Sequence, residues 1–395
     1  MPYTFDYGNG TVNDPYQVWN LADLNGIRDY IEPNHGNDYI NIHFEQRADI
    51  DLSGINWIPF GWYYDDIAEE WKNAAFQSHY NGNSYQINNL TINDPGFSSY
   101  LGLFSYIYGG QRNNPHRATI RNIIIKNANI NVSGGVYGGV LVGYATKKVI
   151  VDNCHVINSS ISGNYIIGGL VGLLSDTHPF EEPDAPAKAM YCSFSGDVSG
   201  SYDLGGFCGQ NYGGEIINSY CNSEVNLLAY TNPEHSHWDI GGFTGLNAGG
   251  FEESCYANGE IILHSDPNLI NAVGGYVGQN YGEIKNCFTR AKVNATHADK
   301  VGGFVGILYD ETIEHCYNAN EISGGTTVGG FCGEFYEYST IINSYYNSEL
   351  TGQSDTDKGT PKTTLEMTYP YSNPETIYVN WDFDEIWRHD KGEQQ

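Results

Sequence analysis

The sequence predicts an all-β protein folded as a single parallel β-solenoid (β-helix) of about nine turns. First, a five-residue block, glycine–glycine–aromatic or leucine–any residue–glycine, recurs every 27 to 38 residues, as in "GGFCGQNYGGEIINSY" (205–220) and "GGYVGQNYGEIKNCF" (274–288). Second, an element resembling I-x-N-C-Y follows each block. Third, apolar and polar residues alternate in short segments such as "IRNIII" (120–125), which is typical of β-strands.

The repeat length argues against other repeat folds. Four-stranded propeller blades need roughly 40 residues or more, and helical repeats of about 34 residues need two amphipathic helices each. Gly, Asn and β-branched residues interrupt every candidate helix between the blocks. We expect the glycines at corners where a side chain would not fit. The blocks begin at Gly168, Gly205, Gly241, Gly274, Gly302 and Gly329, with degenerate copies at Leu101 and Gly139.

The I-x-N-C-Y elements predict a ladder of inward-facing side chains. Leu, Ile, Cys and Ser can share one position of a repeat if that position points into the core. Stacked side chains point the same way rather than at each other, so we expect the cysteines to be free thiols. The ladder positions are Leu90, Ile123, Cys154, Cys192, Ser219, Cys255, Cys287, Cys316 and Ser344.

The two ends are expected to be caps, because an open solenoid would expose unpaired strand edges. Residues 1–80 are interpreted as an N-terminal strand and helix cap with the first solenoid elements, 81–350 as the repeats, and 351–395 as a C-terminal cap. A short amphipathic helix after Asn20 would cover the first turn through Leu21, Leu24, Ile27 and Ile31. The last turn would be covered by Trp381, Phe383, Ile386 and Trp387.

The charge balance limits the partners of the protein. The chain has 47 acidic and 18 basic residues and a net charge of −29, so nucleic acid and anionic membrane surfaces are not expected to bind. No stretch approaches the roughly 20 apolar residues of a membrane-spanning helix, so no membrane insertion is expected. The start "MPYTFDYGNG" lacks the features of a signal peptide. We expect an extracellular surface or a virion as the location, reached without a leader in this sequence.

No catalytic motif or metal site is evident, and the chain is predicted not to be an enzyme. It contains no H-E-x-x-H, G-x-S-x-G or C-x-x-C sequence, so no catalytic residue, metal or cofactor is assigned. Solenoid hydrolases use carboxylates on adjacent turns of one face, and no such cluster is recognised in the repeat. Glu215, Glu283 and Asp310 follow glycine blocks and are interpreted as solvated turn acids.

Two insertions on consecutive turns are the candidate binding site. They span Leu227–Asp239 and Leu263–Asn271, where the interval to the next glycine block is longest. Aromatic rings beside polar groups suit contact with sugar or protein. The H-x-H sequence within the first insertion is a weak metal signal, and ordinary loop histidines are the simpler interpretation. The candidate ligand-binding residues are Tyr230, His235, His237, Trp238 and His264.

The repeat resembles the GLUG repeat, which is named for blocks such as "GGLVG" (168–172). The likeness extends to "GTVNDPYQVWNLADLNGIRDY" (10–30), "ADIDLSGINWIPFG" (48–61), "YNGNSYQINNLTI" (80–92) and "NWDFDEIWRHDKGE" (380–393). GLUG repeats occur in extracellular modules of bacterial adhesins and of IgA-cleaving metallopeptidases. The resemblance therefore implies that this chain is a surface protein. It concerns the repeat domain alone and does not include the peptidase part of those proteins.

The sequence favours a noncatalytic, adhesin-like interaction protein, a rigid solenoid that displays loops for attachment on a cell surface or virion. The expected partners are a cell-surface glycan or protein, or other surface or virion proteins, and a homo-oligomer is possible. The alternative is a solenoid enzyme that processes glycans as a hydrolase or lyase.

Overall fold

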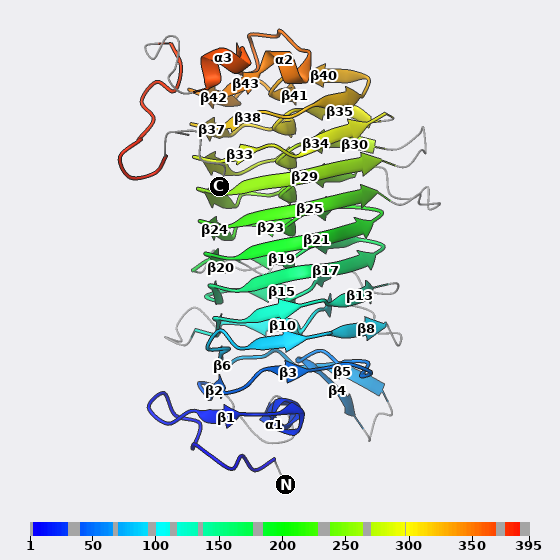
Figure 1. Ribbon diagram of the computed structural model, residues 1–395, viewed down its shortest axis with the longest axis vertical. Helices are drawn as coiled ribbons and strands as arrows, with labels where there is room; N and C mark the ends of the chain where they lie inside the picture. Colours follow the sequence, from blue (N-terminus) through cyan, green and yellow to red (C-terminus); the bar gives the residue numbers. More distant parts are fainter. Residues whose placement is uncertain are drawn as a thin grey trace.

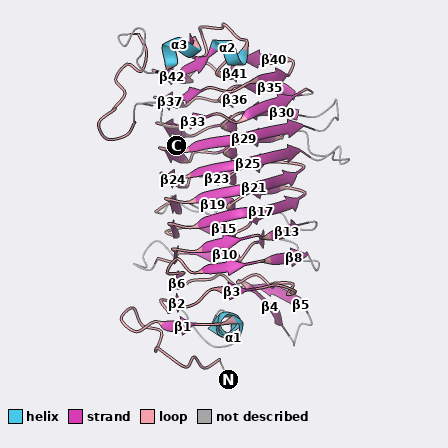
Figure 2. Cartoon of the chain, in the orientation of Figure 1, coloured by secondary structure: helices cyan, strands magenta, loops and turns pink. Residues whose placement is uncertain are grey.

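The computed structural model describes residues 3–30, 40–65, 70–93, 100–110, 117–132, 137–176, 185–227, 238–263, 270–296, 298–368 and 376–387. These residues form a rod of stacked turns in which nearly all regular structure is strand, with short helices only near the two ends (Figure 1, Figure 2). The predicted parallel β-solenoid is confirmed. No described helix has the length and apolar character needed to cross a membrane.

Each full turn of the rod passes through four parallel sheets, which we number in the order in which the chain meets them. The first sheet has 11 strands and the second has 15. The first comprises β1 (Tyr16–Val18), β2 (His43–Gln46), β6 (His79–Asn81), β11 (Thr119–Arg121), β16 (Ile150–Asp152), β20 (Lys188–Met190), β24 (Glu215–Ile217), β28 (Phe251–Glu253), β32 (Glu283–Lys285), β37 (Thr312–Glu314) and β42 (Thr340–Ile342). The second comprises β3 (Ile50–Asp51), β7 (Gln86–Asn88), β8 (Thr91–Asn93), β12 (Ile124–Lys126), β13 (Asn129–Val132), β17 (His155–Gly163), β21 (Ser193–Gly200), β25 (Tyr220–Leu227), β29 (Tyr256–Leu263), β33 (Phe288–Thr289), β34 (Lys292–Ala295), β38 (Tyr317–Asn318), β39 (Ile322–Gly324), β43 (Tyr345–Asn347) and β44 (Thr360–Lys362).

The third and fourth sheets have eight strands each and flank the glycine blocks. The third comprises β9 (Tyr100–Leu101), β14 (Tyr137–Gly139), β18 (Ile166–Gly168), β22 (Leu204–Gly205), β26 (Asp239–Gly241), β30 (Ile270–Gly274), β35 (Ala298–Gly302) and β40 (Thr327–Gly329). The fourth comprises β10 (Phe104–Tyr108), β15 (Val142–Thr146), β19 (Val171–Ser175), β23 (Cys208–Tyr212), β27 (Thr244–Asn247), β31 (Val277–Asn280), β36 (Val305–Leu308) and β41 (Cys332–Phe335). A separate antiparallel pair joins β4 (Trp62–Asp65) to β5 (Glu70–Asn73).

The I-x-N-C-Y element forms the corner between the first and second sheets. The residue before each ladder position has positive φ, as at Asn153 (51°) and Asn286 (53°), a conformation that Asn tolerates better than most residues. All nine ladder side chains are buried, and all eight cysteines are free. The backbone N–H of Cys287 donates to Sγ of Cys316 on the next turn at 3.4 Å, and that of Cys316 donates to Oγ of Ser344 at 3.0 Å. The small Cys or Ser side chain at one ladder position thus accepts a hydrogen bond from the backbone N–H at the ladder position of the preceding turn.

The glycine blocks form a tight arch between the third and fourth sheets. A Cβ on Gly274 would lie 2.0 Å from the carbonyl oxygen of Val277 and 2.7 Å from that of Phe304 on the next turn. The aromatic residue of each block points into the core, and successive rings stack with centroids 4.7 to 5.0 Å apart. The stacked rings belong to Phe207, Phe243, Tyr276, Phe304 and Phe331.

The N-terminal helix lies where the sequence predicts it. Helix α1 (Leu21–Gly26) begins after Asn20, whose side chain accepts from the N–H groups of Ala22 and Asp23 at 2.8 and 3.1 Å. A 3₁₀ helix, η1 (Ile27–Tyr30), continues it. Leu24 and Ile27 are fully buried, so this cap seals the first turn.

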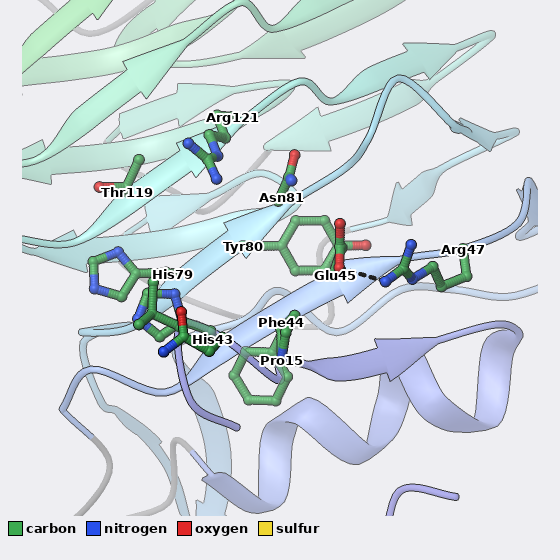
Figure 3. A pocket seen from close by; sticks show the side chains of 12 residues that line it. Pro15, His43, Phe44, Glu45, Arg47, His79, Tyr80, Asn81, Thr119 and Arg121 are labelled. Atoms are coloured by element: carbon green, nitrogen blue, oxygen red, sulfur yellow. Dashed lines mark ion pairs between the residues drawn. The ribbon is translucent and has the colours of Figure 1, made fainter. Parts of the chain in front are cut away.

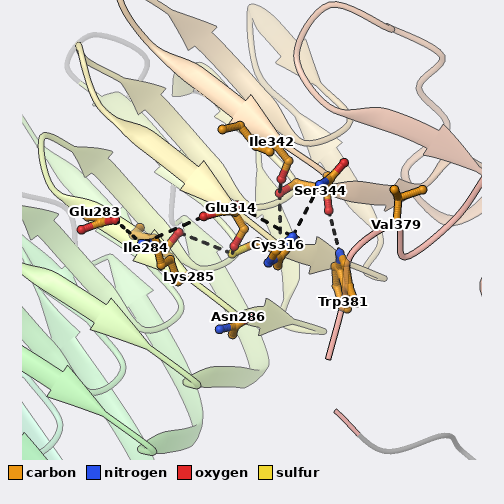
Figure 4. A network of polar contacts seen from close by, with 12 residues as sticks. Glu283, Ile284, Lys285, Asn286, Glu314, Cys316, Ile342, Ser344, Val379 and Trp381 are labelled. Atoms are coloured by element: carbon orange, nitrogen blue, oxygen red, sulfur yellow. Dashed lines mark hydrogen bonds and ion pairs between the residues drawn. The ribbon is translucent and has the colours of Figure 1, made fainter. Parts of the chain in front are cut away.

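The C-terminal end differs in detail from the prediction. Short helices α2 (Ser348–Thr351) and α3 (Thr364–Met367) lie at that end of the rod (Figure 1). The Trp381 indole (Figure 4) donates to the carbonyl oxygen of Asn343 at 2.8 Å. The centroid of the Trp387 ring lies 5.8 Å from that of Tyr317 and 6.2 Å from that of Phe288, which belong to earlier turns. The segment that contains Trp381 and Trp387 therefore packs along the side of the second sheet as well as near the last turn. It contacts the aromatic side chains of Phe288 and Tyr317 on that sheet.

Candidate functional site

The structure changes the status of one predicted binding residue. Trp238 is only 2% exposed and belongs to the hydrophobic core, so it is not the exposed contact residue that the sequence suggested. It directly precedes β26, and its indole packs inward with the turn that follows the insertion. The other four predicted residues, Tyr230, His235, His237 and His264, lie outside the described residues.

A column of tyrosines follows the fourth sheet and forms an exposed aromatic surface, which we call the tyrosine column: Tyr281, Tyr309 and Tyr336. Their rings stack with centroids 4.3 and 4.4 Å apart and interplanar angles of 3° and 14°. Tyr281 is 40% exposed and Tyr336 45% exposed. Each N–H in the column donates to a carbonyl of the preceding turn, which fixes the spacing of the rings.

The hydroxyl groups of Tyr281 and Tyr309 stay protonated over the physiological range. Partial burial raises the pKa of Tyr281, and burial together with the neighbouring Tyr336 and Tyr281 raises the pKa of Tyr309. The stacked rings cover one another's faces, so the column exposes a row of ring edges with their hydroxyl groups. Such a surface can contact sugar or apolar protein groups while also forming hydrogen bonds.

A second aromatic column, on the second sheet, is partly covered. Tyr220, Tyr256, Phe288 and Tyr317 stack with centroids 4.8 to 5.0 Å apart. Trp387 contacts the Phe288 and Tyr317 end of this column, whereas no described residue outside the tyrosine column stacks on its three rings. The tyrosine column is consequently the more accessible of the two surfaces.

An acid pair that the sequence interpretation missed is buried beside the third sheet. Asp203 and Asp239 precede the glycine blocks of consecutive turns, and the adjoining Leu204 and Ile240 are in register. The two aspartates are 2% and 4% exposed, and neighbouring parallel strands lie about 4.8 Å apart. The sequences "DLGG" and "DIGG" contain this signal, whereas the sequence analysis considered only the acids that follow the glycine blocks.

Burial gives the acid pair unusual protonation behaviour. Desolvation raises the pKa of Asp203 to about 7, opposed by a hydrogen bond from the Gln210 side chain to its carboxylate. Desolvation and the adjacent Asp203 charge raise the pKa of Asp239 well above its ordinary range. Oδ1 of Asp239 has no hydrogen-bond partner among the described residues. Two buried carboxyl groups this close favour a shared proton over two negative charges.

The acids considered from the sequence have structural partners. Glu215 and Glu283 begin strands β24 and β32 rather than lying in turns, and they pair with Lys188 and with Lys285. The Lys285 ammonium also approaches Glu314 at 4.0 Å (Figure 4). Across the described ranges, no group of three or more His, Cys, Asp or Glu side chains could hold a metal ion.

Comparison with known proteins finds relatives but no matching family model. The chain is 30% identical over 97% of its length to a protein of Evansella cellulosilytica described as a candidate Gly-rich membrane protein, of which it spans 44%. It is 30% identical over 51% of its length to halomucin of Haloquadratum walsbyi, of which it spans 2%. The chain thus covers less than half of either relative.

Two solved structures resemble the fold. One, described as an IgA1 protease, matches 83% of this chain and 21% of its own at a TM-score of 0.50 and 16% identity. The other, from Bacteroides ovatus and described as a candidate immunoglobulin A1 protease, matches 86% of this chain and 87% of its own at a TM-score of 0.48 and 20% identity. These identities establish likeness of fold alone.

The prediction that the chain is not an enzyme is contradicted. A solved structure with this fold carries the name of a peptidase, so the solenoid does not argue against catalysis. In addition, Asp203 and Asp239 form a pair of acidic side chains on adjacent turns, which the sequence analysis did not recognise. The exclusion of enzymatic function is therefore withdrawn.

Proposed function

We propose that this chain is the β-solenoid arm of a longer surface protein, which attaches to a cell-surface glycan or protein through the tyrosine column. The single observation that carries the proposal is the stack of exposed, evenly spaced tyrosine rings on a rigid scaffold. Little conformational entropy is lost when a partner binds a surface whose side chains are already ordered. Tyr supplies large contact area with only two side-chain torsions to fix.

The names of two relatives support this proposal. The relatives described as a Gly-rich membrane protein and a halomucin are both longer than this chain. A solenoid segment inside such proteins would act as a spacer that holds binding surfaces away from the cell. The insertions at 227–239 and 263–271, which lie largely outside the described residues, connect strands of the second and third sheets and stay a separate proposed contact region, with Tyr230 as the aromatic residue to test.

Binding to an array of purified polysaccharides and to whole cells would test the attachment proposal. The variant Tyr281→Ala/Tyr309→Ala should lose at least tenfold in affinity, because it removes two adjacent rings of the contact surface together with their hydroxyl groups. Tyr220→Ala/Tyr256→Ala is the matched control, since it removes two stacked tyrosines from the second sheet. Equal losses in both variants, or undiminished binding of the first variant with its fold intact, would reject the tyrosine column as the contact surface.

A second candidate function is glycan processing, favoured by the acid pair on consecutive turns. The two carboxyl groups come from neighbouring turns, and retaining glycoside hydrolases use two nearby carboxyl groups, of which one acts as acid and the other as nucleophile. Because both carboxyl groups are buried, a substrate would have to displace neighbouring side chains to reach them. Release of reducing ends from a polysaccharide panel would test this, with Asp203→Asn expected to abolish it. Release that persists in Asp203→Asn and Asp239→Asn would place the activity elsewhere.

A further inference from the structure

A cavity of about 400 Å³ opens on the outer face of the first sheet near the N-terminal cap (Figure 3). Its floor comes from β2, β6 and β11, and residues Val12, Asn13 and Pro15 form one side. The strands are in register, so His43, His79 and Thr119 make one outward column. Pockets of roughly 300 to 1,000 Å³ hold small molecules, and this one lies at the lower end of that range.

The second outward column of the cavity contains Glu45, Asn81 and Arg121, in register on the same three strands. Figure 3 shows Arg47 beside Glu45 at one edge and Arg121 beyond Asn81. Tyr80 and Phe44 alternate with these residues and are buried in the core. Alternation along the strands thus places the polar side chains on the outside of the rod.

The cavity is cationic although the protein is strongly acidic. Two of the seven arginines of the chain line it, together with two histidines, while the net charge of the whole chain is −29. Glu45 is the single acidic lining residue. Its carboxylate already accepts from Arg47 at 2.8 Å and from the Asn83 amide at 2.6 Å. The negative charge inside the cavity is therefore already matched by donors.

Both arginines retain unused donors. Nε of Arg47 is buried and has no hydrogen-bond partner among the described residues. Arg121 is exposed, and within the described ranges its guanidinium forms no ion pair, although Asp152 follows it in the same column. The buried Nε itself does not face the cavity, but the Arg47 side chain is 36% exposed, and both arginines line the cavity. A bound anion would supply acceptors for the exposed parts of the two guanidinium groups.

We infer that this cavity binds an acidic sugar, whose carboxylate or sulfate is held by Arg47 and Arg121. The planar guanidinium group matches these anions through paired hydrogen bonds. Thr119 and Asn13 add a hydroxyl and an amide, and the stacked rings of His43 and His79, 4.2 Å apart, add ring nitrogens. These groups suit sugar hydroxyls. The cavity lies at the opposite end of the rod from the tyrosine column, so the inference goes beyond the proposed function (Figure 1).

Calorimetric titration of the full chain at low ionic strength would test this inference. The probes are glucuronic acid, glucose 6-sulfate, glucose and inorganic sulfate. We expect millimolar or tighter binding of at least one acidic sugar and at least tenfold weaker binding of glucose. Arg121→Gln should weaken acidic sugar binding at least tenfold, and added salt should weaken it as well. Lys292→Gln, which removes one positive charge from an exposed strand at the other end of the rod, should have no effect.

Four results would overturn the inference. They are equal binding of glucose and the acidic sugars, equal binding of inorganic sulfate and the sugars, equal losses in Arg121→Gln and Lys292→Gln, or no binding by the folded wild type. Failure of Tyr281→Ala/Tyr309→Ala to affect attachment would leave this result untouched, so the two proposals fail separately. A melting temperature close to the wild type would establish that Arg121→Gln is folded.

Discussion

Glu252 occupies a position in the core where the solenoid otherwise places apolar side chains. It lies on β28 between Ile216 and Ile284 of the adjacent turns and is fully buried. Oε1 accepts from the Thr244 hydroxyl at 2.8 Å and from the Asn211 amide at 3.3 Å, whereas Oε2 has no hydrogen-bond partner among the described residues. Desolvation by burial raises the pKa of Glu252 from 4.5 to about 7.

This raised pKa makes the stability of the protein depend on pH. The folded protein holds a proton that the unfolded chain releases, so the stabilisation is fully present below pH 4.5 and is lost as pH rises through about 7. The gap between the two pKa values corresponds to about 3 kcal/mol. Glu252→Gln keeps the shape of the side chain and removes its titration. Relative to the wild type, the variant should gain on the order of 3 kcal/mol between pH 4.5 and pH 8.

Urea unfolding followed by circular dichroism at intervals from pH 4 to pH 8.5 would measure this difference. Glu253→Gln is the matched control for the loss of one carboxyl group, because its side chain lies on the outer face of the same strand. A difference between Glu252→Gln and wild type that stays constant within about 0.5 kcal/mol across the pH range would refute the reasoning. Glu252 would then be ionised in the folded state or accessible to water.

Three further predictions concern other buried features. Asp239→Asn should raise the melting temperature above pH 7, because burial raises the pKa of both aspartates and the adjacent Asp203 raises that of Asp239 further; an unchanged melting temperature would mean that the acid pair is solvated. Cys287→Arg should prevent folding, measured by loss of the β-sheet circular dichroism signal, because it places an unpaired charge in the ladder; near-normal melting would disprove the ladder. Gly274→Ala should destabilise the folded protein by roughly 2 kcal/mol or more, because the added Cβ would lie 2.0 Å from a backbone oxygen. Gly249→Ala should cost about 1 kcal/mol, because there only the φ of 76° opposes the change. Equal effects of the two substitutions on the urea midpoint would contradict the tight arch.

The repeat made the local structure of each turn predictable. Asn122, Asn153 and Asn218 stand at left-handed corners, and the following residues point inward, because each turn repeats the same short-range geometry. Asn20 predicted the start of helix α1 for a similar local reason. These features depend on residues within one or two positions of one another, so a pattern in the chain is enough to reveal them.

The candidate sites were harder to predict because they depart from the repeat. Trp238 looked exposed because it ends a polar insertion, but packing of the next turn buries it. Asp203 and Asp239 looked unremarkable because each is a lone acid within its own turn. Tyr281 and Tyr309 belong to the recurring "NY" and "LY" sequences, yet their exposure depends on which neighbouring segments cover them.

The sequence by itself determined the solenoid, its corners, its ladder and its N-terminal helix, since regular spacing of glycine, asparagine and apolar residues leaves few other ways to bury the core. Only the tertiary structure decided which side chains of different turns meet. It brought Arg47 and Arg121 to one cavity and laid Trp387 against Phe288 on the flank. The physical reason is that stacking at about 4.8 Å turns separations of about 30 to 40 residues into direct contacts. Burial, and with it the raised pKa values of Asp203 and Glu252, arises only once those neighbouring turns are in place.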